Sequence, residues 1–264
     1  MERTQNTTVT QPEPTQEIPT TTTTTELTQE IPTTTEPTNQ FVTSLQLNWI
    51  FYVVMLCCLY AISYYGKTNF IMAIITFILM SFCGYLTHVG SHIIDFEHSF
   101  HLFDNKINNG ITTNSWLNPI AQFIVYVLGF HNKIHHDLEK SKQIPNRIQE
   151  FVCNWVTQAG GLLFLKYLLS NLNSSVIFMW GFQYATVHMI NYDLLQEKIH
   201  MKHHIDANTN LGMDIWDILF HTKYNNNNYE IEQHNHYSIN TIILTGIMCY
   251  WLYQSNLEST TTKK

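Results

Sequence analysis

The 264-residue chain has few charged residues, no dense basic segment and few cysteines. Asp, Glu, Lys and Arg make up 12% of the residues, about half of the roughly 25% in a typical soluble domain. Aromatic and aliphatic residues instead gather in long runs, which favours a membrane setting. The formal net charge is -7, and no Lys/Arg stripe is interleaved with aromatic residues. Nucleic-acid binding is therefore not supported.

The five cysteines do not form the pattern of a secreted disulfide framework. They all lie within or beside apolar segments, where they are expected to be reduced and to behave as small hydrophobic residues: Cys57, Cys58, Cys83, Cys153 and Cys249. The start of the sequence also lacks a basic stretch followed by an apolar one, as a cleavable signal peptide would have. We expect the first spanning helix to direct membrane insertion.

Composition divides the chain into three parts. Residues 1–44 are rich in Thr, Pro and Glu, with TQEIPTTT beginning at both Thr15 and Thr28. This tail is expected to be disordered, because it has too little apolar surface to offset its chain entropy. A glycosylated, mucin-like stalk is the alternative if the tail faces the lumen. Residues 45–255 are expected to form a membrane-bound catalytic domain, and residues 256–264 a short polar tail.

Apolar runs predict an all-α integral-membrane fold with about four transmembrane helices in two hairpins. Residues 45–65 and 69–86 would form the first hairpin and residues 151–169 and 174–192 the second, each near the ~20 residues needed to cross a bilayer. The runs at residues 116–130 and 239–253 are shorter and suit re-entrant or interfacial helices.

Lys and Arg predict the orientation. With two hairpins, both termini and the two long connections lie on one side, which holds Lys106, Lys133, Lys140, Lys142, Arg147, Lys198, Lys202 and Lys223. The opposite turns offer only Lys67 and, at most, Lys166. The positive-inside rule makes the lysine-rich side cytoplasmic.

Histidines give the strongest functional signal. All 14 lie between His88 and His236, mostly in tight groups. His88 and His92 are spaced i, i+4, and would lie on one helical face. The trio of His200, His203 and His204 would lie on one side of a single helical turn.

The middle group is less regular. His131 and His135 are again spaced i, i+4, while His136 is rotated by about 100° from its neighbour and could reach a second ion. His188 adds an ionisable side chain near the end of a predicted span. The alternative is that these groups are solvated interfacial histidines. The predicted metal ligands are His88, His92, His131, His135, His136, His188, His200, His203 and His204.

Eight or nine imidazoles imply two ions, because a structural zinc site needs four ligands and usually includes cysteine. Imidazole alone does not choose between Fe, Zn, Cu and Ni. Nearby carboxylates could fix the ring tautomers or be ordinary surface charges: Asp95, Glu97, Asp137, Asp193, Glu197 and Asp206. His98, His101, His221, His234 and His236 are expected to be mostly solvated or to lie behind the ligands. No catalytic residue is predicted beyond the metal ligands.

The histidine boxes resemble those of the fatty acid hydroxylase and sterol desaturase superfamily. The most specific part is the stretch from His200 to Gly212, which continues into Trp216-Asp217-Ile-Leu-Phe220-His221-Thr222, similar to the family's WD-x-x-F-x-T ending. The middle box departs from the family pattern, with Asn132 where the first histidine would stand. Either His131 substitutes for that ligand or one ligand is missing.

The resemblance implies an O2-dependent lipid hydroxylase or desaturase with two iron ions, which zinc could replace in a purified protein. Its substrate would be a fatty acid, sphingolipid or sterol, and a cytochrome b5-like protein would donate electrons. The expected location is the endoplasmic reticulum, as a multi-pass protein with the tail and the histidine site in the cytoplasm. The alternatives are a histidine-rich metal transporter and a catalytically inactive scaffold relative.

Overall fold

The computed structural model describes residues 37–94, 117–160, 163, 166–167, 169–195, 198–224 and 231–261. They all belong to one compact unit that spans Pro32–Lys264. These residues form helices and loops, with no strand among them. The predicted all-helical class is therefore confirmed for this part of the chain.

Helices of three kinds make up the described part of the chain. The α-helices are α1 Pro37–Leu47, α2 Trp49–Gly66, α3 Phe70–Ile93, α5 Leu117–Phe130, α6 Leu138–Ser141, α7 Ile144–Trp155, α9 Ser174–Thr186, α10 Lys198–Ile205, α11 Asp214–Leu219 and α12 Ser238–Thr261. Shorter elements are the π-helical segments η1 His131–His135, η2 Val156–Gly160 and η3 Val187–Leu194, and the 3-10 helix η4 His234–Tyr237.

Helices α2 and α3 form the first predicted hairpin. Lys67, with a φ of 52°, ends α2 in a left-handed conformation. The side chain of Asn69 accepts two hydrogen bonds from backbone N–H groups in the first turn of α3. The second helix continues to Ile93, beyond its predicted end. This extension keeps His88 and His92 on the helix, as their i, i+4 spacing predicts.

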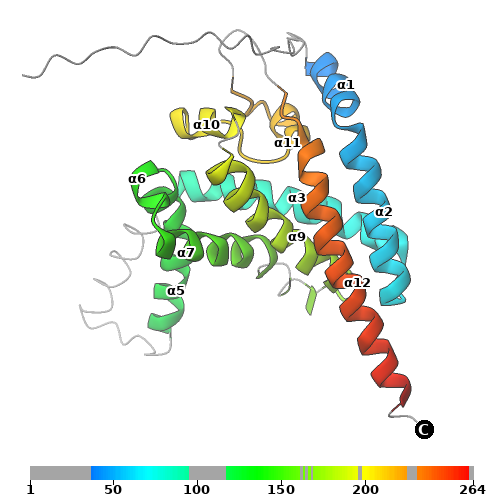
Figure 1. The fold of residues 1–264 in the computed structure, drawn as a ribbon. Coiled ribbons are helices and arrows are strands. Elements are labelled where there is room, and N and C mark those ends of the chain that lie inside the picture. Colours follow the sequence, from blue (N-terminus) through cyan, green and yellow to red (C-terminus); the bar gives the residue numbers. More distant parts are fainter. Residues whose placement is uncertain are drawn as a thin grey trace, which may run out of the picture. The chain divides into compact units, whose positions relative to one another are not determined.

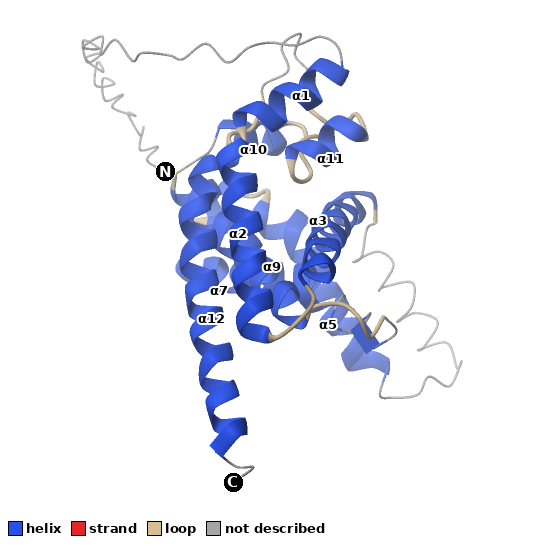
Figure 2. Cartoon of the chain, turned by 90° about the vertical axis from the view of Figure 1, so that its right-hand side faces the viewer, coloured by secondary structure: helices blue, strands red, loops and turns tan. Residues whose placement is uncertain are grey.

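Helices α2 and α12 lie side by side, as Figures 1 and 2 show from two directions. Close to the start of both helices, the Asn235 side chain donates to the carbonyl of Leu47 at 2.7 Å. Near their ends, Asn256 donates to the carbonyl of Tyr65, also at 2.7 Å. The two helices therefore run parallel.

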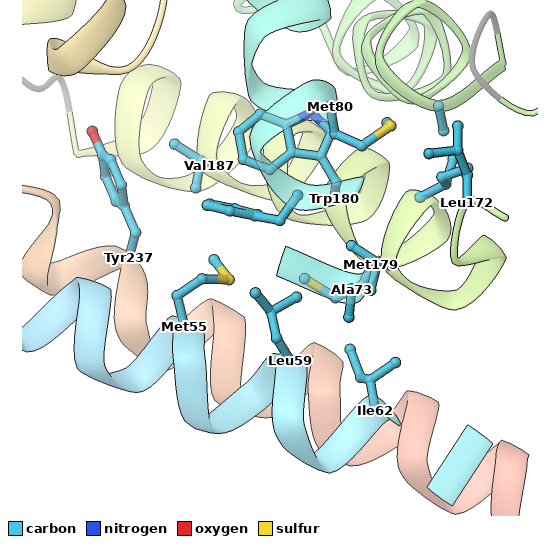
Figure 3. Packing of buried hydrophobic residues seen from close by; sticks show 14 of the residues in the cluster. Met55, Leu59, Ile62, Ala73, Met80, Leu172, Met179, Trp180, Val187 and Tyr237 are labelled. Carbon is cyan, nitrogen blue, oxygen red and sulfur yellow. The ribbon is translucent and has the colours of Figure 1, made fainter. Parts of the chain in front are cut away.

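An apolar core lies between α2, α3 and α9 (Figure 3). Met55, Leu59 and Ile62 of α2 are each at most 1% exposed, and each such side chain contributes about 1.5–3 kcal/mol by leaving water. The core reaches Val187 and Tyr237 at one end. His188 directly follows Val187 in the chain, so packing of the core helps to set the position of this histidine.

Two of the described helices, α2 and α3, are long and apolar enough to cross a membrane. This finding is compatible with a membrane protein, but it does not reproduce the four predicted crossings. Residues 174–194 divide into a 13-residue α-helix and an eight-residue π-helix. Residues 151–169 are described only in part.

The described helices extend into the ranges predicted for both tails. Helix α1 begins at Pro37, whereas disorder was predicted up to residue 44, and residues 1–36 lie outside the described part. The buried face of α1 consists of Gln40 and Ser44, followed by Asn48 at the start of α2, so hydrophobic periodicity could not predict it. Helix α12 continues to Thr261, beyond the predicted end of the domain at residue 255.

Candidate metal centre

Nine predicted ligands from four parts of the chain lie together near the end of α3. His88 and His92 belong to α3, and His188 to η3. His131 and His135 belong to η1, and His136 follows it directly. Helix α10 carries the other three: His200, His203 and His204. Three groups have their ligand atoms within 4.8 Å of one another: His88, His92, His131 and His203; His135, His200 and His204; and His135, Glu150 and His188. Each could hold a metal ion.

The first group is centred on His131. Its Nε2 atom lies 3.0 Å from that of His88, 2.9 Å from that of His92 and 3.2 Å from that of His136. A ring nitrogen has either one hydrogen or one lone pair, so hydrogen bonds alone cannot satisfy three such neighbours. Two nitrogens at right angles around one ion, each ~2.1 Å from it, would be ~3.0 Å apart. The observed spacing therefore fits a common metal ion.

The other two groups share His135. The Nε2 atoms of His200 and His204 are 3.1 Å apart, and the ring centroid of His135 lies 4.6 Å from that of His204. Glu150 and His188 complete the third group on the other side of His135. In this third group, the Glu150 carboxylate contacts Nδ1 of His135 at 2.6 Å, so Glu150 can orient His135 while the other two groups could each hold one ion.

The π-helical segment η1 changes how the middle histidines are divided. The sequence predicts that His131 and His135 face one ion and that His136 is turned away. Instead, the N–H of His136 donates to the carbonyl of His131 at 3.3 Å, the i→i+5 bond of a π-helix. This wider turn places His136 beside His131 and directs His135 to the other groups. The predicted division therefore differs from the structure, although all three side chains reach the centre.

Hydrogen bonds behind the rings select the tautomers. Nδ1 of His203 donates to the carbonyl of Thr209 at 2.7 Å, which leaves the lone pair on Nε2, facing the first group. Nδ1 of His135 donates to the carboxylate of Glu150 at 2.6 Å, with the same result. These contacts orient ligands in the way that carboxylates and carbonyls do around many metal sites.

Glu150 is a site residue that the sequence analysis missed. It is 2% exposed, and the same oxygen that accepts from His135 lies 3.7 Å from Nδ1 of His188. Burial alone would raise the pKa of Glu150, but the two histidines outweigh burial and lower it. A signal was present, because Glu150 lies three residues before the buried Cys153 and so on the apolar face of the amphipathic helix α7.

The carboxylates predicted to support the histidines have other roles where they are described. Asp137 caps α6 and pairs with Lys140 at 2.8 Å, and Asp206 accepts from the N–H of Asn208 at 3.2 Å. They are ordinary surface charges. The side chain of Asp193 is not described, and Asp95, Glu97 and Glu197 lie outside the described residues.

The segment from Trp216 to Thr222 braces the loop that follows α10. The carboxylate of Asp217 accepts from two backbone N–H groups of this loop, at 2.8 and 3.1 Å, and from the Thr222 hydroxyl at 2.7 Å. The same loop supplies the Thr209 carbonyl that orients His203. The segment therefore supports the metal centre without contributing a ligand.

The site histidines favour the neutral form. Burial, with the nearby imidazoles as a second cause, lowers the pKa of His136 to about 3 and that of His204 to about 4. The same causes hold the pKa values of His131 and His200 well below the ordinary 6.5. A neutral imidazole keeps the lone pair that a metal ion needs, so the cluster is ready for binding without first losing protons.

A cavity of about 60 Å³ adjoins the centre. His88, His188 and His200 are among the residues that line it, and much of the lining is aromatic: Phe51, Tyr85, Trp180, Tyr184, Tyr192 and Tyr237. The Tyr192 ring stacks on that of His200, with centroids 3.9 Å apart and an angle of 8°. A reacting group could therefore reach the metal centre from this cavity.

Three other described histidines, His221, His234 and His236, lie outside the three groups. His221 is exposed, as predicted. His234 is only 2% exposed and lines the cavity, so it is not solvated, and His236 is half-buried. His98 and His101 fall outside the described residues.

No family model, curated protein or solved structure matches this chain. The resemblance seen in the histidine boxes therefore stays a prediction. What the chain does is inferred from the arrangement of its own residues.

Proposed function

We propose that the chain is a membrane-bound, O2-dependent lipid hydroxylase or desaturase of the fatty acid hydroxylase and sterol desaturase type. The observation that carries this proposal is the convergence of nine histidines with Glu150 beside a cavity. This many neutral donors exceeds what one ion needs and suits a pair of iron ions, with zinc as a substitute in a purified protein. A set of two nearby sites also suits chemistry better than a structural role.

When bound, such a pair of ions would activate O2 with two electrons from the partner protein and two protons, so that hydroxylation of a C–H bond gives an alcohol and one water, and desaturation gives an alkene and two waters. The chain's own residues hold and orient the ligands. Glu150 and the Thr209 carbonyl fix the tautomers of His135 and His203, and Tyr192 covers the ring of His200. A cytochrome b5-like partner would supply the electrons.

Exposed apolar stripes support a position in a membrane. On α3, Ile71, Ile75 and Ile78 are 60%, 46% and 50% exposed, at spacings that place them on one face. Only 33% of the apolar window of α2 and 39% of that of α3 are buried in the fold, so these helices differ from the core helix of a soluble protein. The proposed location is the endoplasmic reticulum, with the lysine-rich side in the cytoplasm.

Two other functions make different predictions. A transporter would hold its ions near the bilayer midplane on broken helices, whereas His200, His203 and His204 lie on the short polar helix α10. A catalytically inactive relative would lack one or both ions. Metal analysis of the purified protein separates these cases, since the proposal expects about two iron ions per chain and none of the lipid chemistry without them.

The decisive experiment is lipid profiling of cells that express the chain or its His203→Ala, His204→Ala double mutant. The wild type should convert a lipid to a product with an added hydroxyl or double bond, and the double mutant should form none. Glu139→Gln is the matched control, because the Glu139 side chain is 88% exposed and lies outside the metal groups. Identical lipid profiles for wild type and double mutant would reject the proposal.

A further inference from the structure

One wall of the cavity is polar, although most of its lining is aromatic. Gln183, Glu232 and His234 line it and are 4%, 4% and 2% exposed. They come from α9 and from the segment that leads into α12. Buried polar groups normally have hydrogen-bond partners, so the partners of these three side chains show what the wall can still bind.

Gln183 presents an acceptor. Its Nε2 donates to the carbonyl of Tyr237 at 3.4 Å, and because a carbonyl can only accept, the amide cannot be reversed. Its Oε1 is buried and has no hydrogen-bond partner among the described residues. A ligand in the cavity that meets this atom must therefore donate a hydrogen bond.

His234 presents a donor. Its Nε2 accepts from the backbone N–H of Asp214 at 3.4 Å, so the ring carries its hydrogen on Nδ1. That Nδ1 is buried without a hydrogen-bond partner among the described residues; the nearest carboxylate oxygen, of Glu232, is 4.0 Å away. The wall thus offers both a free acceptor and a free donor.

Glu232 adds negative charge. Its Oε1 accepts from the hydroxyl of Tyr192 at 3.0 Å and from that of Tyr237. The nearby ammonium group of Lys223 bonds to Asp214 at 2.5 Å instead. A ligand carboxylate or phosphate beside Glu232 would be repelled by its carboxylate, and Lys223 offsets this little because it is already paired with Asp214.

We infer that the cavity binds the hydroxyl-bearing end of a lipid alcohol, in preference to a carboxylate or a plain hydrocarbon. A hydroxyl can donate to Gln183 and accept from His234, and it carries no charge to oppose Glu232. This inference rests on the proposed function and names the substrate class of the same site. At about 60 Å³, the cavity has room for only a few non-hydrogen atoms, since one water needs roughly 10–15 Å³ by this measure.

A consequence for regiochemistry follows from the histidines in the same lining. His88, His188 and His200 line the same small cavity, so a lipid anchored by its hydroxyl places nearby carbons beside the metal centre. The oxidised position should lie within a few bonds of the hydroxyl and not in the middle of a long acyl chain.

The test measures equilibrium binding to the purified protein in detergent, without turnover, in the metal-loaded form and again after metal removal, because metal ions at the histidines would themselves attract a carboxylate. The probes are 1-hexadecanol and cholesterol, which separate a long-chain alcohol from a sterol alcohol, and hexadecane and hexadecanoate, which lack the hydroxyl. At least one alcohol should bind about tenfold or more tightly than hexadecane and hexadecanoate, because a buried site built for a hydroxyl leaves its polar groups unpaired with the analogue.

Two variants test the assigned atoms. Gln183→Met keeps the length of the side chain and should weaken alcohol binding about tenfold while leaving hexadecane binding unchanged. Glu232→Gln should retain alcohol binding and increase hexadecanoate binding several-fold, a charge effect that general destabilisation would not produce. Thr245→Val is the matched control, because Thr245 is buried on α12 but does not line the cavity.

Equal binding of alcohols and hexadecane, as expected if only water occupies the wall, would overturn the inference. So would an unchanged preference for alcohols over hexadecanoate in Glu232→Gln. Selective alcohol binding together with an unaltered lipid profile in the His203→Ala, His204→Ala cells would reject the proposed enzyme function while leaving the assigned ligand class in place.

Discussion

Glu150 offers the sharpest test of how the metal centre is built. Its carboxylate contacts Nδ1 of His135 at 2.6 Å, on the side of the ring away from the lone pair that would bind a metal ion. This geometry makes Glu150 an orienting residue for His135. Glu150→Gln keeps an oxygen that can accept from the same Nδ1–H, whereas Glu150→Ala removes the acceptor and leaves a buried donor unpaired.

The expected magnitudes follow from this difference. Removing a carboxylate that orients a metal-bound histidine typically weakens metal affinity by about 10–100-fold, or about 1.4–2.8 kcal/mol. We expect Glu150→Ala to fall in this range and Glu150→Gln to lose less than about tenfold. Competition with a chromogenic chelator measures the affinity, and circular dichroism in detergent verifies that each variant is folded.

Glu139→Gln is the matched control, because the Glu139 side chain is 88% exposed and pairs with Lys142 at 3.1 Å, away from the metal groups. It should bind metal as the wild type does. If Glu150→Gln lost as much affinity as Glu150→Ala, Glu150 would be a direct ligand and the orienting role would be refuted. Wild-type affinity in a folded Glu150→Ala protein would remove Glu150 from the site altogether.

Two further predictions concern stability. Histidines of the unfolded chain take up protons below about pH 6.5, whereas burial lowers the pKa of His204 in the folded chain to about 4. The unfolded state therefore binds more protons between these values, and the melting temperature of the metal-free protein should fall as the pH decreases from about 6.5 toward 4. A flat profile over this range would contradict the assigned burial, and His204→Gln should lose part of the dependence. A Cβ on Gly181 would lie 2.6 Å from that of Ala159, so Gly181→Ala should lower the free energy of unfolding by about 1–3 kcal/mol. Gly246→Ala meets nothing within 4 Å and should be neutral or stabilising by up to about 1 kcal/mol; similar melting temperatures for the two variants would count against the packing of α9 on η2.

Local spacing predicted the parts of the centre that a single helical turn determines. His88 and His92 lie on α3 and the trio lies on α10, as the i, i+3 and i+4 spacings indicate. The trio is nevertheless divided, because His203 belongs to the first group and His200 and His204 to the second. Their meeting was also expected, because so many neutral imidazoles have few other uses. The division of the middle group was not predictable, since a π-turn and an α-turn have no distinct sequence signature in His131–His136.

Residues that act through distant contacts gave weaker signals. Glu150 is an isolated acidic residue, and only its place on the apolar face of α7 marks it. Helix α1 was missed for a related reason. Its buried side is polar, and Ser44 donates to Asp214 at 3.1 Å across 170 positions of sequence, a contact that neither composition nor periodicity encodes.

Two kinds of interaction hold the cavity and the metal centre in a fixed relation. Apolar packing positions α3 and α9, which carry His88 and lead to His188. Polar contacts position the polar wall of the cavity: Asn48 donates to the carbonyl of Glu232 at 2.8 Å and accepts from the N–H of His234 at 2.6 Å. Because a buried polar group that loses its partner costs about 1–3 kcal/mol, few alternative arrangements of this wall are accessible. The distance between the polar anchor and the ligands is therefore a property of the fold, and that distance would determine which carbon of a bound lipid faces the metal.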